Sequence, residues 1–238
     1  MRGQHFYLYL FEDLFSRKIV GWQVFDRESA ELASQLLQDI CERQGIRPGQ
    51  LTEHSDNGSP MKGETMLAAM HRLGVAHTRS RPAVSNDNPY VESAFRTLKY
   101  RPELPVRPFE SLLVARRWVT DLAHWYNHEH RHSGIRYVTP AQRHAGGDGP
   151  VLAARHALYQ RARETNPRRW SGRTRDWTPV GAVTLNPERD NVVAAATQTL
   201  LSASTGEPAP PSRPGVLAAA STVVAAPAIG RPLQPSTG

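Results

Sequence analysis

The chain has 238 residues, of which 39% are hydrophobic, so it is long and apolar enough to bury a core of its own. Its 29 Lys and Arg residues against 22 Asp and Glu residues give a net charge of +7, which favours a polyanionic partner such as nucleic acid. A single cysteine, Cys41, excludes an internal disulfide framework and favours a reducing compartment. No apolar run is long enough to cross a membrane, and the first residues lack a signal-peptide pattern.

The first predicted elements are a β-hairpin and a helix. The segments HFYLYLFE (residues 5–12) and IVGWQVF (residues 19–25) have the apolar and aromatic character of strands, and DLFSRK supplies turn residues between them. A helix is predicted next, because Ser29 can cap its start and Gly45 follows its end. Its apolar side chains share one face, which places Cys41 in the core: Leu32, Leu36, Leu37, Ile40 and Cys41.

Strands and helices then alternate. QLTEHSD predicts a short strand, KGETMLAAMHRLG a helix and VAHT a brief strand. A further helix is expected from Asn86 or Asp87 to about Tyr100, and a long one lies within residues 108–130, with Phe109, Leu112, Leu113, Val119, Leu122 and Trp125 facing inward. Strands that alternate with helices after a hairpin predict an α/β fold with a mixed sheet flanked by helices.

The rest of the chain predicts two further regions after a main domain of residues 1–145. Residues 146–193 form a small basic appendage, with a helix over 150–164 and a strand in PVGAVTLNP. Residues 194–238 are rich in Ala, Pro, Ser and Thr and show no periodic apolar face. We therefore expect a disordered tail, in which VLAAASTVVAA forms at most a brief helix.

One predicted helix combines an acid with two cations. Val91, Ala94, Phe95 and Leu98 form its buried stripe, and at about 100° per residue Glu92, Arg96 and Lys99 lie on an adjacent face. There Arg96 and Lys99 can bind phosphates while Glu92 holds a divalent metal ion.

A second acid, Asp56, follows a predicted strand and precedes Asn57 and Gly58. Ligands commonly bind at the carboxyl ends of strands in open α/β sheets, and oxygen ligands suit Mg²⁺ or Mn²⁺. The alternatives are a simple turn at Asp56 and a solvated ion pair between Glu92 and Arg96.

The sequence resembles the DDE transposases, which share their catalytic core with retroviral integrases, and it is most similar to those of insertion-sequence family 3. The resemblance covers about residues 5–145 and is carried by YLYLFEDLFSRKIVGW, HSDNGSPMKG, SRPAVSNDNPYVESAFRTLKYRPELP and WYNHEHRHSGIRYVTPAQRH. Between Asp56 and Glu92 lie 35 residues, as in the family's D-D-35-E pattern, and Lys99 matches a basic residue seven positions after the glutamate.

The resemblance implies a ribonuclease H-like fold with Asp56 and Glu92 as catalytic, metal-binding carboxylates. It implies that Lys99 contacts transposon-end DNA, with Arg96, Asn57, Asn86 and Asn88 as weaker candidates for DNA or site contacts. The implied activity is Mg²⁺- or Mn²⁺-dependent strand cleavage and strand transfer, in which two ions assist the attacking and leaving oxygens. The expected partners are transposon ends, target DNA and further copies of the chain or a full-length transposase, in the cytoplasm and nucleoid of a bacterium.

The family needs a third carboxylate, and the sequence departs from the pattern there. The first aspartate of the family lies on a central strand that precedes the hairpin, and no residue of this chain matches it. Asp13 is expected to accept backbone hydrogen bonds in the turn instead. We therefore expect an N-terminally truncated core that lacks its first strand and is inactive alone. The alternatives are a non-catalytic DNA-binding or transposase-inhibiting fragment and a nuclease for RNA–DNA hybrids.

Two other patterns have competing interpretations. His124 and His128 have the spacing of a helical zinc pair, but they also match the aromatic and basic segment of the family. RRWSGRTRDW interleaves arginines, among them Arg168 and Arg169, with tryptophans. This composition favours DNA binding over a solvated basic edge.

Overall fold

The computed structural model describes residues 5–55, 58–80, 89–101, 108–183 and, for the backbone alone, 215–224. Its centre is a mixed five-stranded sheet with the order β2-β1-β5-β3-β4. The strands are β1 (Phe6–Asp13), β2 (Lys18–Phe25), β3 (Leu51–Ser55), β4 (Ala76–Arg79) and β5 (Gly215–Val224). β1 is antiparallel to β2 and β5, whereas β3 is parallel to β4 and β5.

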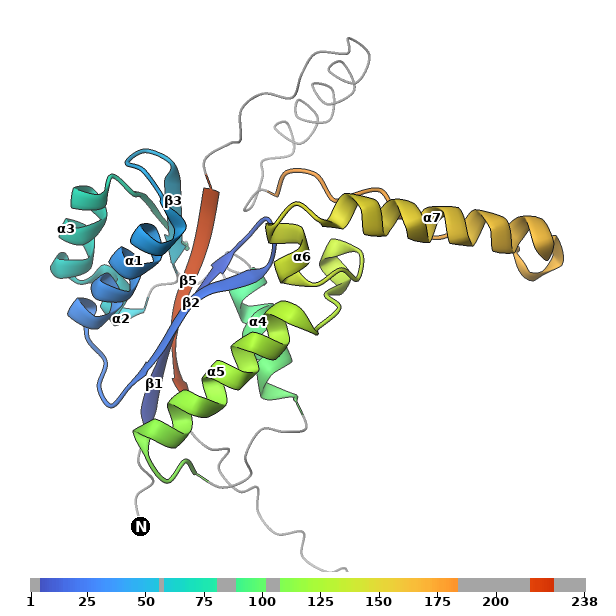
Figure 1. The fold of residues 1–238 in the computed structure, drawn as a ribbon. Helices are drawn as coiled ribbons and strands as arrows, with labels where there is room; N and C mark the ends of the chain where they lie inside the picture. Colours follow the sequence, from blue (N-terminus) through green and yellow to red (C-terminus); the bar gives the residue numbers. More distant parts are fainter. Residues whose placement is uncertain (1–4, 56–57, 81–88, 102–107, 184–214, 225–238) are drawn as a thin grey trace, which may run out of the picture.

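Helices cover both faces of the sheet (Figure 1). They are α1 (Ala30–Gln44), α2 (Ser59–Lys62), α3 (Glu64–Leu73), α4 (Pro89–Lys99), α5 (Leu112–His128), α6 (Pro140–His144) and α7 (Asp148–Thr165), with short 3-10 turns η2 (Ser133–Ile135) and η3 (Pro167–Arg169). α1, α2 and α3 lie on one face, and α4 and α5 on the other. The mixed sheet flanked by helices was predicted from the alternating pattern.

β1 contributes to a hydrophobic core on each face of the sheet, because its side chains alternate between the two faces. Tyr9 and Phe11 face α1 and α3, in a core that includes Leu37, Ile40 and Cys41. Phe6, Leu8 and Leu10 point to the other face and pack with residues of α4 and α5. Because both faces are covered, both sets of side chains are apolar.

Local sequence signals are accurate in α1. Its Ser29 cap accepts from the backbone N–H groups of Glu31 and Leu32, and Gly45 adopts the left-handed conformation at its end with φ of 63°. The expected burial of Cys41 is confirmed. In α5 one prediction was wrong, because Leu113 is 71% exposed. It lies in the first turn of the helix on the side away from the core, whereas Leu112 and Ala115 of the same turn pack against the core.

Two segments near the end of the chain differ from expectation. Residues 215–224, where the sequence predicts disorder or a brief helix, form β5 in the middle of the sheet. Residues 179–183, expected to begin a strand, carry no strand, and the Val180 carbonyl accepts a hydrogen bond from the Arg143 side chain at 2.6 Å. Within the described residues no helix has both the length and the apolar character to span a membrane.

Candidate functional site

The helix α4 presents the acid and the two cations on its solvent-facing side. Val91, Ala94 and Leu98 are buried, as the predicted stripe requires, and Phe95 is half-buried. Glu92, Arg96 and Lys99 are exposed. A carboxylate and two cations that share one exposed helix face can meet a phosphate and a metal ion together.

The turn between β1 and β2 holds α4 in place. Leu14 of this turn is buried against Val91, and Tyr90 and Phe95 pack on the same pair. The guanidinium of Arg17 lies 3.7 Å from the centre of the Tyr90 ring, a cation–π contact at the start of α4. The segment DLFSRK therefore positions the helix that carries Glu92.

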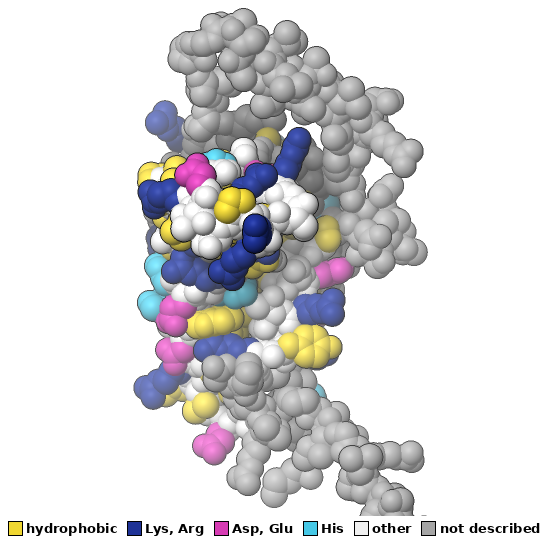
Figure 2. Space-filling model, turned by 90° about the vertical axis from the view of Figure 1, so that its right-hand side faces the viewer, with side chains coloured by type: hydrophobic (Ala, Val, Ile, Leu, Met, Phe, Trp, Pro, Cys, Tyr) yellow, Lys and Arg dark blue, Asp and Glu magenta, His cyan; other side chains and the backbone are white. Residues whose placement is uncertain are grey.

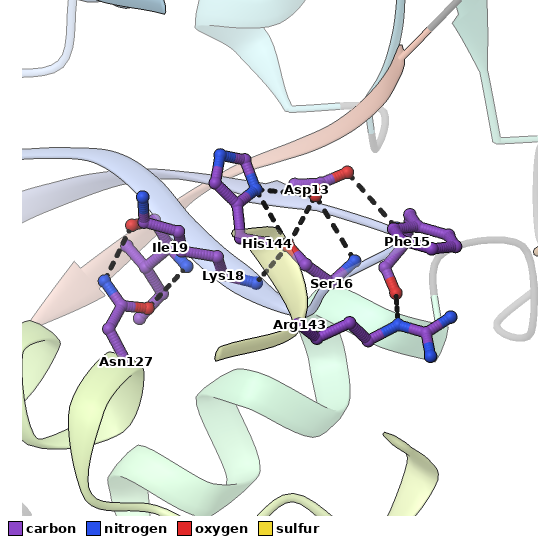
Figure 3. A network of polar contacts seen from close by, with 8 residues as sticks. All are labelled: Asp13, Phe15, Ser16, Lys18, Ile19, Asn127, Arg143 and His144. Carbon is purple, nitrogen blue, oxygen red and sulfur yellow. Dashed lines mark hydrogen bonds and ion pairs between the residues drawn. The ribbon is translucent and has the colours of Figure 1, made fainter. Parts of the chain in front are cut away.

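The same turn is fixed internally by Asp13 (Figure 3). Its carboxylate accepts from the backbone N–H groups of Phe15 at 3.2 Å and Ser16 at 3.3 Å, and from the Ser16 hydroxyl. His144 Nδ1 of α6 lies 3.1 Å from it. Burial acts to raise the pKa of Asp13, but the hydrogen bonds from His144 and Ser16 outweigh it and lower the pKa below its usual value. Asp13 thus has the turn-stabilising role that the sequence predicts.

Two further residues tie the turn region to the helices behind it (Figure 3). Arg143 is buried and its Nε donates to the Phe15 carbonyl at 2.7 Å. Asn127 of α5 is also buried, and it both donates to the Ile19 carbonyl and accepts from the Ile19 N–H, each at 2.9 Å. The Asn127 amide thus pairs with both backbone groups of Ile19, as a residue of a neighbouring strand would.

Hydrogen bonds also fix the end of β3. The carbonyl of Ser55 accepts from the Ser80 N–H at 3.0 Å and from the Ser80 hydroxyl at 3.3 Å. The His54 ring lies between Thr78 Oγ1 at 2.9 Å and Ser80 Oγ at 3.4 Å. The predicted site residues Asp56, Asn57, Asn86 and Asn88 lie outside the described residues, but the strand that leads into Asp56 is fixed up to the preceding residue.

A buried polar cluster was missed by sequence reasoning. The carboxylate of Glu12 has no hydrogen-bond partner among the described residues, and the same holds for the Tyr126 hydroxyl and two nitrogens of Arg17. Burial raises the pKa of Glu12 to about 8, against the attraction of Arg17. Burial lowers the pKa of His132 to about 4, and the positive Arg17 contributes. The alternation of β1 could have revealed Glu12, which shares a face with Leu8 and Leu10.

The other predicted DNA-binding residues lie on a separate projection, the basic arm, which we define as residues 148–177. α7 extends away from the sheet, and η3 with Arg168 and Arg169 lies at its outer end (Figure 1). The chain then runs back along α7, where Tyr159 contacts Trp170 and Trp177 at ring distances of 5.9 and 5.3 Å.

The basic arm carries exposed charge far from α4. It contains three acidic residues and seven arginines, which are Arg155, Arg161, Arg163, Arg168, Arg169, Arg173 and Arg175. Figure 2 looks at its outer end, where Lys and Arg side chains lie on several sides. The structure therefore does not bring Arg168 and Arg169 together with Glu92, Arg96 and Lys99.

The two histidines of α5 that have the spacing of a zinc pair lie close together. The rings of His124 and His128 lie 4.8 Å apart. Within the parts of the chain that the structure describes, no group of three or more His, Cys, Asp or Glu residues is arranged to hold a metal ion.

Comparison with known proteins identifies the class. Two family models, both described as integrase core domain, match residues 1–85 and 73–140 and so cover residues 1–140 between them. Residues 1–140 therefore carry an integrase core domain of the kind found in DDE transposases. The mixed sheet and its helices confirm the predicted ribonuclease H-like α/β fold.

Its relatives are insertion-sequence transposases. The chain is 31% identical over 135 residues to the transposase for insertion sequence element IS904 of Lactococcus lactis, covering 56% of this chain and 53% of the relative. It is 31% identical over 137 residues to transposase InsF for insertion sequence IS3A of Escherichia coli, covering 57% and 47%. The chain thus spans about half the length of these curated relatives.

Among solved structures, the chain is similar to one in a cryoEM structure of a simian T-cell lymphotropic virus intasome in complex with PP2A regulatory subunit B56 gamma. The TM-score is 0.42 at 19% identity, over 57% of this chain and 46% of the other.

Proposed function

We propose that the chain is the DNA-binding integrase core of an insertion-sequence transposase, with Asp56 and Glu92 as two of its metal-binding carboxylates. The observation that carries the proposal is the exposed face of α4, where Glu92 lies beside Arg96 and Lys99. The match of residues 1–140 to integrase core domains supports it.

The proximity of α4 and β3 in the sheet supports a shared divalent cation. α4 contacts β5, and β5 pairs with β3, so the helix that bears Glu92 lies one strand away from the strand that leads into Asp56. Carboxylate oxygens are the donors that Mg²⁺ and Mn²⁺ prefer. When bound, such ions would polarise a phosphodiester for in-line displacement. Arg96 and Lys99 would hold the neighbouring phosphates.

DNA binding by α4 can be tested with salt. Fluorescence anisotropy with a 30-base-pair duplex is measured over a range of NaCl concentrations for the parent chain and for the double variant Arg96→Ala/Lys99→Ala. Each lost phosphate contact should reduce the slope of log K against log salt by about 1. The matched control is Arg43→Ala, an exposed arginine of α1 on the opposite face of the sheet, which should leave the slope unchanged. An unchanged slope in the double variant would refute the assignment of Arg96 and Lys99.

We further propose that the chain alone binds DNA without cutting it. The resemblance implies a third carboxylate on a central strand, but the central strand here, β5, reads GVLAAASTVV and contains no Asp or Glu. The two acids of β1 do not replace it, since Glu12 is fully buried and the Asp13 carboxylate stabilises the turn.

The test is nicking of supercoiled plasmid DNA in Mg²⁺ or Mn²⁺. We expect no activity above the buffer control. Nicking by the purified chain that disappears in Glu92→Gln and in Asp56→Asn would overturn this part of the proposal while supporting the metal site.

A second candidate function is inhibition of a complete transposase through mixed assemblies, and the acid-free β5 favours it. Such a chain would compete for the same DNA and for subunit positions. Co-purification with a full-length transposase and a loss of its strand-transfer activity as this chain is added would support inhibition. Light scattering of the chain alone shows whether it associates with itself, and a monomer that leaves the full-length enzyme active would exclude this function.

A further inference from the structure

The centre of the sheet is filled by a strand from the far end of the chain. Residues 217–224 of β5 pair with residues 6–13 of β1, and residues 215–219 pair with residues 51–55 of β3. β5 therefore lies between two halves of the sheet, and residues 217–219 have partners on both sides. In Figure 1 this strand runs through the middle of the fold, between the helices of the two faces.

The two halves of the sheet depend on β5 for their connection. Among the described residues, β2 and β1 form one ladder, β3 and β4 form another, and only β5 joins them. Without it β1 and β3 would each present a row of unpaired backbone N–H and C=O groups inside the fold, at a high cost in free energy. The core that includes Tyr9 of β1 and Leu51 of β3 spans both halves, so its packing also requires that they stay together.

The composition of β5 suits a strand covered on both sides. It is an uncharged run of ten residues with three valines and a threonine, whereas the nearest charged residues are Arg213 and Arg231 outside it. Buried central strands have this continuous, uncharged character. Pairing through the backbone supplies affinity, and the absence of charge allows burial.

We propose that the facing edges of β1 and β3 form a strand-acceptor site and that residues 215–224 are its ligand, supplied by the same chain. The segment lies outside the residues that match the integrase core domain, yet it completes that core. While β5 occupies the site, no other strand can pair there, including one that carries a carboxylate. Residues 215–224 thus complete the sheet and also prevent another strand from pairing at its centre.

Hydrogen exchange of the intact chain tests the pairing. We expect backbone amides of residues 215–224 to be protected to the same degree as those of β1 and β3, because β5 pairs with both strands within one sheet. Free exchange of residues 215–224 beside protected β1 and β3 would overturn the proposal.

A proline substitution tests whether the two halves of the sheet depend on β5. Ala219 is paired on both sides, with Phe11 and with Ser55, so Ala219→Pro removes a donor and disrupts both ladders. Protection of β1 and β3 should fall roughly 100-fold, as expected for loss of a central strand. The matched control Ala203→Pro makes the same change outside the strand and should leave protection at the parent level. Equal protection in both variants would contradict the acceptor site.

A labelled peptide of residues 214–226 distinguishes an exchangeable site from a general destabilisation. It should bind the full-length Ala219→Pro chain, whose own strand no longer pairs, and should not bind the parent chain. A peptide that itself carries Ala219→Pro should bind neither. Failure of the first peptide to bind the variant would refute a strand-acceptor site. Light scattering that shows a dimer of the parent chain, with protection that falls on dilution, would show that a second copy supplies the strand and would overturn its supply by the same chain.

Discussion

The buried carboxyl of Glu12 makes the stability of this fold depend on pH. Glu12 is fully buried in β1, and neither carboxylate oxygen has a hydrogen-bond partner among the described residues. Burial is the main reason that its pKa rises from 4.5 to about 8, with a contribution from the negative Asp13 and opposition from Arg17. The folded chain therefore keeps a proton on Glu12 at pH values where the unfolded chain has lost it.

The sign and size of the effect follow from proton linkage. Between pH 4.5 and about 8 the folded state binds more protons than the unfolded state, so the free energy of unfolding falls as pH rises. The fall is about 1.4 kcal/mol for each pH unit, or about 4 to 5 kcal/mol over the whole interval as an upper limit. Below pH 4.5 the contribution is constant, because Glu12 is protonated in both states.

The substitution Glu12→Gln isolates this contribution, because glutamine has the shape of the protonated acid at every pH. Near pH 5 the unfolding free energies of the parent and the variant should differ only by a constant offset. By pH 8 the unfolding free energy of the variant should have risen by several kcal/mol relative to that of the parent. Urea unfolding followed by circular dichroism at pH 5, 6, 7 and 8 measures this difference, and all other titrating groups cancel in it.

The control is Glu110→Gln, which changes an exposed glutamate just before α5 and should follow the parent at every pH. If the difference between the parent and Glu12→Gln stays constant from pH 5 to pH 8, the carboxyl is not protonated in the fold and the reasoning fails.

Two further substitutions test the contacts behind the turn. Arg143→Met removes the buried donors to the Phe15 and Val180 carbonyls. We expect the free energy of unfolding to fall by about 3 to 5 kcal/mol and hydrogen exchange near Val180 to become faster. Thermal unfolding that shows full stability would argue against this role of Arg143. Asn127→Ala leaves the N–H and C=O of Ile19 unpaired and should cost about 2 to 3 kcal/mol in urea unfolding, whereas a loss below 0.5 kcal/mol would mean that water replaces the amide at little cost.

The buried polar contacts were not predictable from the sequence, and the reason is physical. Arg143 and Asn127 lie more than 100 residues from the backbone groups in the turn region that they bond. A composition or a period cannot indicate which distant carbonyl a side chain will meet. The pKa of Glu12 likewise depends mainly on burial by distant parts of the chain, and its neighbours Asp13 and Arg17 have smaller effects. The sites at Asp56, Asn57, Asn86 and Asn88 stay predictions.

The sequence by itself determined the elements whose causes are local. Ser29 and Gly45 bound α1, the alternation of β1 sets which side chains face each core, and the spacing of Val91, Ala94 and Leu98 turns Glu92 to solvent. Only the tertiary structure decided the place of β5. An uncharged run of ten residues becomes a strand when it finds two free edges, and those edges belong to segments about 160 to 210 residues away. Strand pairing depends on both partner strands, so the sequence pattern of one segment cannot predict it.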